Sequence, residues 1–213
     1  MKAYRVHEYR DTAKFVKDEV DKPIVKKGHV VVEVKASSLN PIDHKLLKSD
    51  LGINPALPGV LHMDVSGVIT EVGEGVTAFK VGDDIYGCAG GLQGEAGLIQ
   101  GALADFMLVD SNLIALKPNS IGFAESAALP LVTITAWEGL FDRASIKKDD
   151  HILIHGGAGG VGHIAIQLAR VHGARIATTV SSAYKAKVVR DLGAEDIIFY
   201  RKEKVKDYTK RLT

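Results

Sequence analysis

A run of glycines at residues 155–162, reading His-Gly-Gly-Ala-Gly-Gly-Val-Gly, constrains the fold more than any other feature of this sequence. Gly157, Gly159 and Gly162 fit the spacing G-x-G-x-x-G, between an apolar strand pattern and a helical pattern. A turn without side chains lets the backbone approach a pyrophosphate closely, and the N-terminus of the following helix favours its negative charge. A plain glycine turn is the competing interpretation, but the strand–turn–helix context favours a dinucleotide site.

Strand and helix patterns alternate around this turn. Apolar residues recur at helical spacing over 160–171 and 183–192, and Gly193 is placed to end the second helix. Strands are expected at 152–154, 175–179 and 197–199, and 203–212 shows a third helical pattern. This order predicts an α/β unit with a parallel sheet.

The first part of the chain has a different pattern, with β-branched stretches separated by glycines. Strands are expected at 29–36, 65–72 and 103–109, and a turn feeding a short strand at 81–87, which is typical of a small β-barrel with many turns. Residues richer in helix formers follow Pro118, at 123–129 and 133–142. We therefore predict two domains, residues 1–120 and 121–213.

The overall composition excludes several classes of protein. Lysine and arginine (27) nearly balance aspartate and glutamate (26), which argues against a nucleic-acid partner or an anionic membrane surface. The single cysteine, Cys88, allows neither an internal disulfide nor a multi-cysteine zinc cluster. The amino terminus has no secretory pattern, and no apolar run is long enough to cross a membrane. A cytoplasmic protein is expected.

The residues after the second expected strand bear on which dinucleotide fits. A carboxylate about 20 residues after the glycines would bind the adenosine ribose of NAD. Here residues 178–185 read Thr-Thr-Val-Ser-Ser-Ala-Tyr-Lys, with no acid. Ser181 and Lys185 suit a 2′-phosphate, which favours NADPH over NADH. Alternatively, Ser181 caps the next helix and Lys185 is a solvated surface lysine.

Several further motifs occur in a consistent order: ASSLNPID at 36–43, LPGV at 57–60, DVSGVI at 64–69, VGEGV at 72–76, VGD at 81–83, AALP at 127–130 and ITAW at 134–137. Together with the glycine turn, they make the whole chain resemble the medium-chain dehydrogenase/reductase superfamily, in particular its zinc-free quinone oxidoreductase (zeta-crystallin-like) branch. The resemblance implies a GroES-like β-barrel catalytic domain followed by a partial, three-strand Rossmann dinucleotide-binding domain.

The zinc-dependent members of this superfamily differ at their metal ligands. Where they carry Gly-His-Glu, residues 62–64 read His-Met-Asp, so the ligand histidine falls on Met63, whose thioether is a poor zinc ligand. Cys88 alone cannot build their four-cysteine structural site. We expect no metal, because two lone histidines such as His44 and His62 are more often ordinary polar residues.

At the substrate end, the resemblance points to Asn40 and Asp43, which match the family motif Asn-Pro-x-Asp. The Asn40 amide could orient the nicotinamide or donate to an enolate oxygen. The alternatives are a turn former before Pro41 for Asn40 and a structural cap for Asp43. Asp64 is expected to brace the barrel. No general acid stands out, which leaves water as the proton source.

The remaining cofactor contacts also follow from the resemblance. Gly160 and Val161 are expected to offer backbone N–H groups to the diphosphate. Thr135 corresponds to the family threonine near the nicotinamide ribose, although Thr133 could make that contact instead. Tyr200 stands where the family often has a tyrosine near the adenosine phosphate, with an ordinary surface tyrosine as the alternative. The predicted cofactor residues are Thr135, Gly157, Gly159, Gly160, Val161, Gly162, Ser181, Lys185 and Tyr200.

The resemblance implies hydride transfer from NADPH to quinones or α,β-unsaturated carbonyl compounds, without zinc. The alternatives are a non-enzymatic dinucleotide-binding or structural protein of crystallin type, and an enoyl-thioester reductase. A dinucleotide fold has two halves, and only three strands of one half are expected here. We therefore expect the amino-terminal part of a longer enzyme that forms a homodimer at full length, and weak or no NADPH binding by this chain alone.

Overall fold

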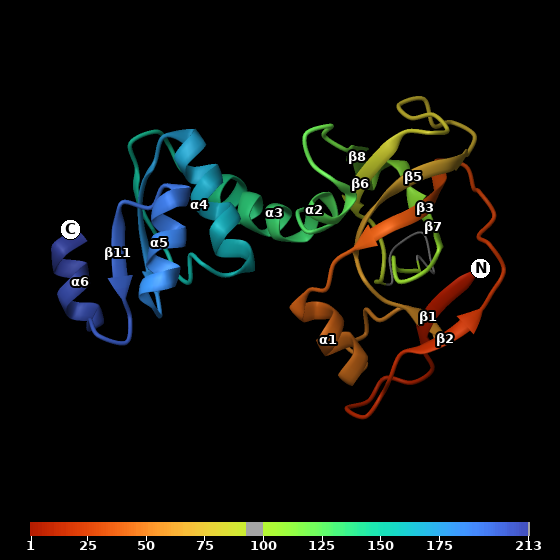
Figure 1. The fold of residues 1–213 in the computed structure, drawn as a ribbon, viewed down its shortest axis with the longest axis horizontal. Helices are drawn as coiled ribbons and strands as arrows, with labels where there is room; N and C mark the ends of the chain where they lie inside the picture. Colours follow the sequence, from red (N-terminus) through yellow and green to blue (C-terminus); the bar gives the residue numbers. More distant parts are fainter. Residues whose placement is uncertain (93–99, 213) are drawn as a thin grey trace. The chain divides into compact units, whose positions relative to one another are not determined.

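The computed structural model describes residues 1–92 and 100–212. The chain divides into two compact units, Met1–Leu131 and Val132–Thr213 (Figure 1). The boundary predicted near residue 120 precedes helix α2 (Phe123–Ala127), which packs on three strands of the first unit. This packing is why the compact first unit extends to Leu131.

The first unit is built from antiparallel sheets. In the described residues, one sheet has the order β2-β1-β4 and another the order β7-β3-β5-β6-β8. The strands are β1 (Lys2–Val6), β2 (Val16–Glu19), β3 (His29–Ser37), β4 (Gly59–Val60), β5 (Asp64–Val72), β6 (Asp84–Cys88), β7 (Phe106–Asp110) and β8 (Ile114–Leu116). Alternate residues of β3, β5 and β7 form an aliphatic core that includes Val30, Val32, Ile69 and Met107.

Short helices follow these strands: α1 (Pro41–Lys48), a 3₁₀ turn η1 (Ser111–Leu113) and α2 in the first unit, α3 (Pro130–Trp137) across the boundary, and a π-helical segment η2 (Glu138–Arg143) in the second unit. Residues 133–142, which are rich in helix formers, are helical, but they belong to two segments. α3 begins earlier, at Pro130, because proline suits the first helical position. Its continuation after Trp137 is a π-helix, which the apolar spacing did not indicate.

The second unit confirms the predicted α/β order. Strands β9 (His151–Ile154), β10 (Arg175–Val180) and β11 (Asp196–Phe199) form a parallel sheet with β10 in the middle. The helices are α4 (Gly160–His172), α5 (Ala183–Leu192) and α6 (Val205–Leu212). Gly193 ends α5 with a left-handed φ of 118°, as predicted from its position.

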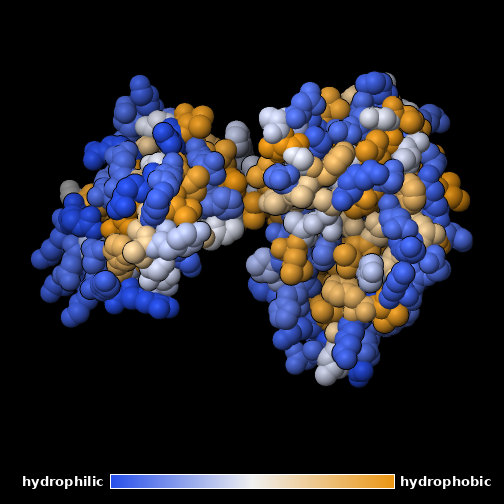
Figure 2. Space-filling view, viewed as in Figure 1, coloured by the Kyte–Doolittle hydropathy of each residue, from blue (hydrophilic) through white to orange (hydrophobic). Residues whose placement is uncertain are grey.

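Helices cover both faces of this sheet. Ile176 of β10 packs in a core with residues of α4 and α5, while the neighbouring Ala177 packs against Tyr208 of α6. Neighbouring strand residues point to opposite faces, so these contacts place α6 opposite α4 and α5. The outward side of α6 is hydrophilic (Figure 2). Within the described part of the chain, no helix is long and apolar enough to span a bilayer.

Candidate functional site

Helix α1 begins at the two residues predicted for the substrate end. Asn40 is the N-cap, in extended backbone, and Asp43 is the third helical residue. The Asp43 carboxylate accepts the Asn40 backbone N–H at 2.7 Å through Oδ2. Its Oδ1 accepts the His62 backbone N–H at 3.2 Å, which connects α1 to the segment before β5. Asp43 therefore caps α1, as in the structural alternative.

The side chain of Asn40 is only 6% exposed and is bonded within the protein. Its Nδ2 donates to Asp64 Oδ2 at 2.8 Å and to Ser38 Oγ at 3.3 Å. A carboxylate only accepts hydrogen bonds, so Asp64 fixes the amide nitrogen on its own side. Ser38 Oγ and Asp64 Oδ2 are themselves 2.6 Å apart, so both acceptors lie on one side of the amide nitrogen and share one of its N–H groups. The second N–H of the amide is not used by these contacts.

Asp64 is the central acceptor of this network and is fully buried. The Ser38 hydroxyl donates to its Oδ2 at 2.6 Å, and the Leu131 backbone N–H donates to its Oδ1 at 2.9 Å. Leu131 lies in the first turn of α3, where backbone N–H groups have no intrahelical acceptor. Asp64 thus connects β5, the residues before α1 and the start of α3, in agreement with the bracing role expected for it.

The cysteine of the chain lies beside the same carboxylate. Burial raises the pKa of the Cys88 thiol to about 12, and the charge of Asp64 and its hydrogen bond act in the same direction. The thiol therefore stays protonated at neutral pH and is a poor nucleophile.

His62 completes the network from an unusual backbone conformation, with φ of 73° in the left-handed region. Its Nδ1 lies 3.0 Å from the Ser37 hydroxyl, and its ring meets Phe15 edge-on with 6.3 Å between centroids. Burial lowers the pKa of His62, while the nearby Asp43 carboxylate opposes this effect. Burial raises the pKa of Asp43 in turn. Charge on either group is thus disfavoured by burial.

The residues of this network do not fit a zinc site. Met63 offers a thioether in place of an imidazole, and the Asp64 oxygens already accept hydrogen bonds from several donors. In residues 1–92 and 100–212, no group of three or more His, Cys, Asp or Glu side chains is placed to hold a metal ion.

The glycine turn lies between β9 and α4 in the second unit, as predicted. Gly159 is the N-cap of α4 and has no side chain with which to cap it. The N–H groups of Gly160, Val161 and Gly162 lack intrahelical acceptors, and no other acceptor in the described ranges takes them. These donors stand at the positive end of a 13-residue helix, which is the arrangement that binds a phosphate.

Close contacts exclude a side chain at two of the three glycines of the motif. A Cβ at Gly157 would overlap the Thr178 hydroxyl, and a Cβ at Gly162 would overlap the Gly156 carbonyl oxygen. At Gly159 the nearest obstacle is the same Gly156 oxygen, at 3.1 Å. The turn's own packing therefore requires Gly157 and Gly162, whereas Gly159 is exposed and less restricted.

Two threonines of β10 bond to the turn from the adjacent strand. The Thr178 hydroxyl accepts the Gly157 N–H at 3.1 Å and donates to the Ile154 carbonyl at 2.7 Å. The Thr179 hydroxyl accepts the Gly156 N–H at 2.8 Å. The sequence analysis gave neither residue a role. The signal that could have indicated them was the pair of neighbouring hydroxyl residues near the end of β10, the strand that pairs with β9.

The parallel sheet gathers the other predicted cofactor residues at one edge. The carboxyl ends of parallel strands lie on the same side, so the residues after β9, β10 and β11 are neighbours there. The glycine turn follows β9, Ser181 follows β10, and Tyr200, 52% exposed, follows β11.

Ser182 caps α5 at this edge, so the alternative in which Ser181 caps this helix is wrong. The Ser182 hydroxyl accepts the Lys185 backbone N–H at 3.3 Å. Ser181 precedes the cap and is half-buried. The Lys185 side chain is exposed, and no carboxylate in the described ranges pairs with its ammonium group.

Both candidate threonines for the nicotinamide ribose lie on α3. Thr133 is half-buried and Thr135 is exposed. Residues two apart on a helix point to different sides, so only one of them can face a given ligand.

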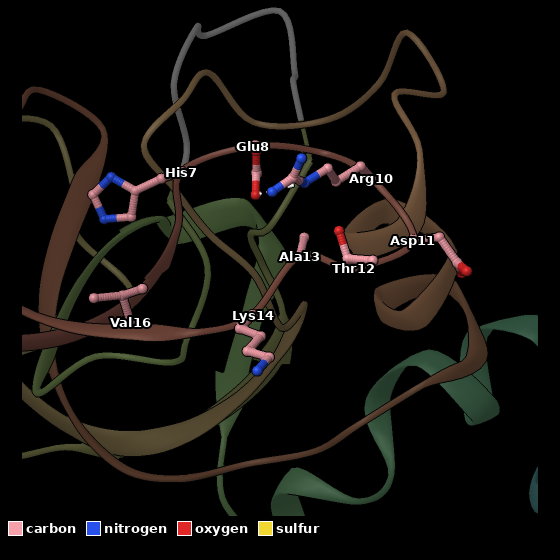
Figure 3. A pocket seen from close by; sticks show the side chains of 8 residues that line it. All are labelled: His7, Glu8, Arg10, Asp11, Thr12, Ala13, Lys14 and Val16. Carbon is pink, nitrogen blue, oxygen red and sulfur yellow. Dashed lines mark ion pairs between the residues drawn. The ribbon is translucent and has the colours of Figure 1, made fainter.

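A cavity of about 720 Å³ opens beside residues 7–16 and is lined by none of the predicted site residues (Figure 3). The ion pair between Glu8 and Arg10, with an N–O distance of 2.7 Å, borders it. Phe15, next to the lining residue Lys14, makes the edge contact with His62. The cavity wall is thereby linked to the polar network.

Comparisons with known proteins place this geometry in a family. The family model described as "Alcohol dehydrogenase GroES-like domain" matches residues 26–119, and the model "Zinc-binding dehydrogenase" matches residues 160–213. The chain is 39% identical to 2-methylene-furan-3-one reductase of Solanum lycopersicum over 97% of its own length and 54% of the relative. It is 40% identical to NADPH-dependent alkenal/one oxidoreductase, chloroplastic, of Arabidopsis thaliana over 87% of its own length and 48% of the relative.

A solved structure of Escherichia coli quinone oxidoreductase complexed with NADPH superposes with a TM-score of 0.83 at 29% identity. The superposition covers 100% of this chain and 62% of that one. The chain spans about half the length of the two curated relatives above.

The two units and the glycine turn define a medium-chain dehydrogenase/reductase. Within this superfamily, the chain belongs to the quinone oxidoreductase-like branch.

Proposed function

We propose that the protein takes part in hydride transfer from NADPH to a quinone or an α,β-unsaturated carbonyl compound, without a metal ion. The observation that carries this proposal is the set of unpaired N–H groups at Gly160, Val161 and Gly162, at the start of α4. The names of the similar proteins, which include a quinone oxidoreductase and an alkenal/one oxidoreductase, support the acceptor class.

We assign parts of the dinucleotide to residues of the second unit. We assign the diphosphate to the amides of residues 160–162, with Gly157 and Gly159 keeping the approach free of side chains. Ser181 and Lys185 would hold the 2′-phosphate, and the absence of an acid in residues 178–185 removes the usual repulsion against it. Thr135 is assigned to the nicotinamide ribose and Tyr200 to the adenosine phosphate.

NADPH, when bound, would supply the hydride, and the acceptor's conjugation would spread the developing negative charge. Such an acceptor needs no Lewis acid, which is consistent with a donor set around Asn40 that does not fit zinc. We assign Asn40 and Asp43 to the substrate end. Their contacts give them a positioning role, since Asp43 fixes the start of α1 and Asp64 fixes the orientation of the Asn40 amide.

The test has a binding arm and a turnover arm. Isothermal titration of the chain with NADPH and with NADH is expected to show weak binding at most, with NADPH bound more tightly than NADH. Oxidation of NADPH in the presence of 1,2-naphthoquinone or an enone, unaffected by a zinc chelator, would support the reaction. Turnover of acyl-thioesters alone, loss of turnover with the chelator, or binding without any turnover would contradict it.

A further inference from the structure

We propose that Thr178 and Thr179 are positioning residues of the anion-binding turn, a role that rests on the proposed function. Neither is assigned to contact the cofactor. Both are buried, and their hydroxyls contact the turn residues that lie 21 and 23 positions earlier in the chain. They belong to the middle strand of the sheet, which is held on both sides.

The Thr178 hydroxyl connects the last residue of β9 with the turn that follows this strand. It donates to the carbonyl of Ile154, the last residue of the strand, and accepts the N–H of Gly157, three residues later. One hydroxyl thus pairs with an acceptor at the end of the strand and with a donor in the turn. The same oxygen occupies the space that a Cβ at Gly157 would need, so Thr178 and Gly157 form a matched pair.

The Thr179 hydroxyl fixes the preceding residue. Gly156 has a left-handed φ of 68°, a conformation that glycine adopts readily but does not prefer over others. Its N–H donates to Thr179 Oγ1 at 2.8 Å, and its carbonyl accepts the Gly159 N–H at 2.8 Å. These two bonds hold Gly156 in one conformation.

The threonines therefore divide the N–H groups of the turn into two sets. Those of Gly156 and Gly157 are used inside the protein, whereas those of residues 160–162 stay available at the start of α4. A flexible glycine turn would have to be ordered when the diphosphate binds, at a cost in affinity. A turn already held by Thr178 and Thr179 avoids most of that cost.

The first experiment needs no ligand. Amide hydrogen exchange of the chain is followed by NMR for the wild type, Thr178→Val, Thr179→Val and the corresponding serine variants. Valine keeps the shape and removes the hydroxyl, whereas serine keeps the hydroxyl. We expect Thr178→Val to accelerate exchange of the Gly157 amide, and Thr179→Val that of the Gly156 amide, by about tenfold or more, with the serine variants close to wild type.

The matched control is Thr209→Val. Thr209 lies in α6 of the same unit, and its hydroxyl bonds to the Val205 carbonyl at 2.9 Å. This variant should leave the Gly156 and Gly157 amides unchanged. A purely structural role for Thr178 and Thr179 would instead accelerate exchange uniformly over the unit. That result, or unchanged exchange at both glycines, would overturn the proposal.

The second experiment measures the dissociation constant for NADPH by nucleotide fluorescence. We expect each valine variant to bind about five- to tenfold more weakly, and each serine variant within about twofold of wild type. Equal affinity for the valine variants and the wild type would overturn the positioning role. If the wild type binds no NADPH at millimolar concentration, the proposed function fails for this chain, while the exchange experiment still decides whether the hydroxyls hold the turn.

Discussion

The carboxylate of Asp64 accepts a hydrogen bond from the backbone N–H of Leu131, 67 positions later in the chain, at 2.9 Å. The same carboxylate accepts from Ser38 and Asn40. One buried side chain thus fixes the first strand residue of β5, the segment before α1 and the first turn of α3. Since buried donors without acceptors are costly, the stability of the first unit should depend strongly on Asp64.

Replacing Asp64 by alanine is expected to lower the free energy of unfolding by about 3 kcal/mol, because it leaves the donors of Ser38, Asn40 and Leu131 unpaired in the interior. Urea unfolding of the two proteins measures this difference. The control is Asp191→Ala, which removes only an exposed ion pair with Lys187 and should cost less than about 1 kcal/mol. Equal losses for the two variants would contradict the bracing role.

His62 makes the stability depend on pH. Burial lowers the pKa of His62 below its ordinary value of 6.5, so the unfolded chain binds more protons between the two values. The free energy of unfolding should therefore fall as the pH falls from 6.5 toward the lowered pKa, and level off below it.

The variant His62→Asn, whose side chain tolerates the left-handed backbone, should lack this fall. Urea unfolding at a series of pH values provides the comparison. The raised pKa of Asp43 acts in the opposite sense, since it adds stability at low pH that is lost as the pH rises. Protonated His62 lowers the pKa of Asp43, so the substitution also changes the Asp43 contribution, and the two proteins are compared in the pH range just below 6.5. Parallel pH profiles for the two proteins would contradict the prediction.

Alanine substitutions should lower the free energy of unfolding by different amounts at the three glycines of the turn. Gly157→Ala and Gly162→Ala are expected to lower the free energy of unfolding by about 2 kcal/mol, because the new Cβ would overlap the Thr178 hydroxyl or the Gly156 carbonyl. Gly159→Ala should cost less than about 1 kcal/mol, since its nearest contact is 3.1 Å away. Thermal or urea unfolding of the three variants decides this, and similar losses at all three positions would count against the packing argument.

If Lys185 binds the 2′-phosphate, its substitution should weaken the binding of NADPH but not that of NADH. Lys185→Glu should weaken NADPH binding by about tenfold or more and leave NADH binding within about twofold, because the reversed charge repels only the extra phosphate. Lys187→Glu on the same helix is the matched control, since the Lys187 ammonium already pairs with Asp191 at 2.6 Å. Isothermal titration with both nucleotides gives the comparison. Equal losses for NADPH and NADH would show that Lys185 does not bind the phosphate.

Local sequence patterns predicted the parts of the fold that depend on neighbouring residues. The strand–turn–helix around Gly157, the parallel sheet and the αL end of α5 at Gly193 are all confirmed. These features follow from short-range rules of periodicity, backbone freedom and capping. The alternative in which Ser181 caps α5 is wrong because the neighbouring Ser182 fits the same rule, and only the backbone path after β10 separates the two serines.

Local sequence patterns could not predict the polar network around Asp64. Its donors lie 24 to 67 positions from Asp64 along the chain, so their proximity depends on the pairing of strands and the path of α3. The roles of Thr178 and Thr179 were missed for the same reason, since their hydroxyls act on a turn more than 20 positions earlier. No alternation or spacing rule links a residue to a partner at such a separation.

The central claim is that the backbone amides of Gly160, Val161 and Gly162 bind the diphosphate of NADPH. A crystal structure of the chain grown with excess NADPH tests it most directly. We predict diphosphate oxygens about 3 Å from these three nitrogens, with the turn conformation unchanged. A diphosphate bound elsewhere, or a turn closed over its own amides in the presence of the nucleotide, would contradict the claim.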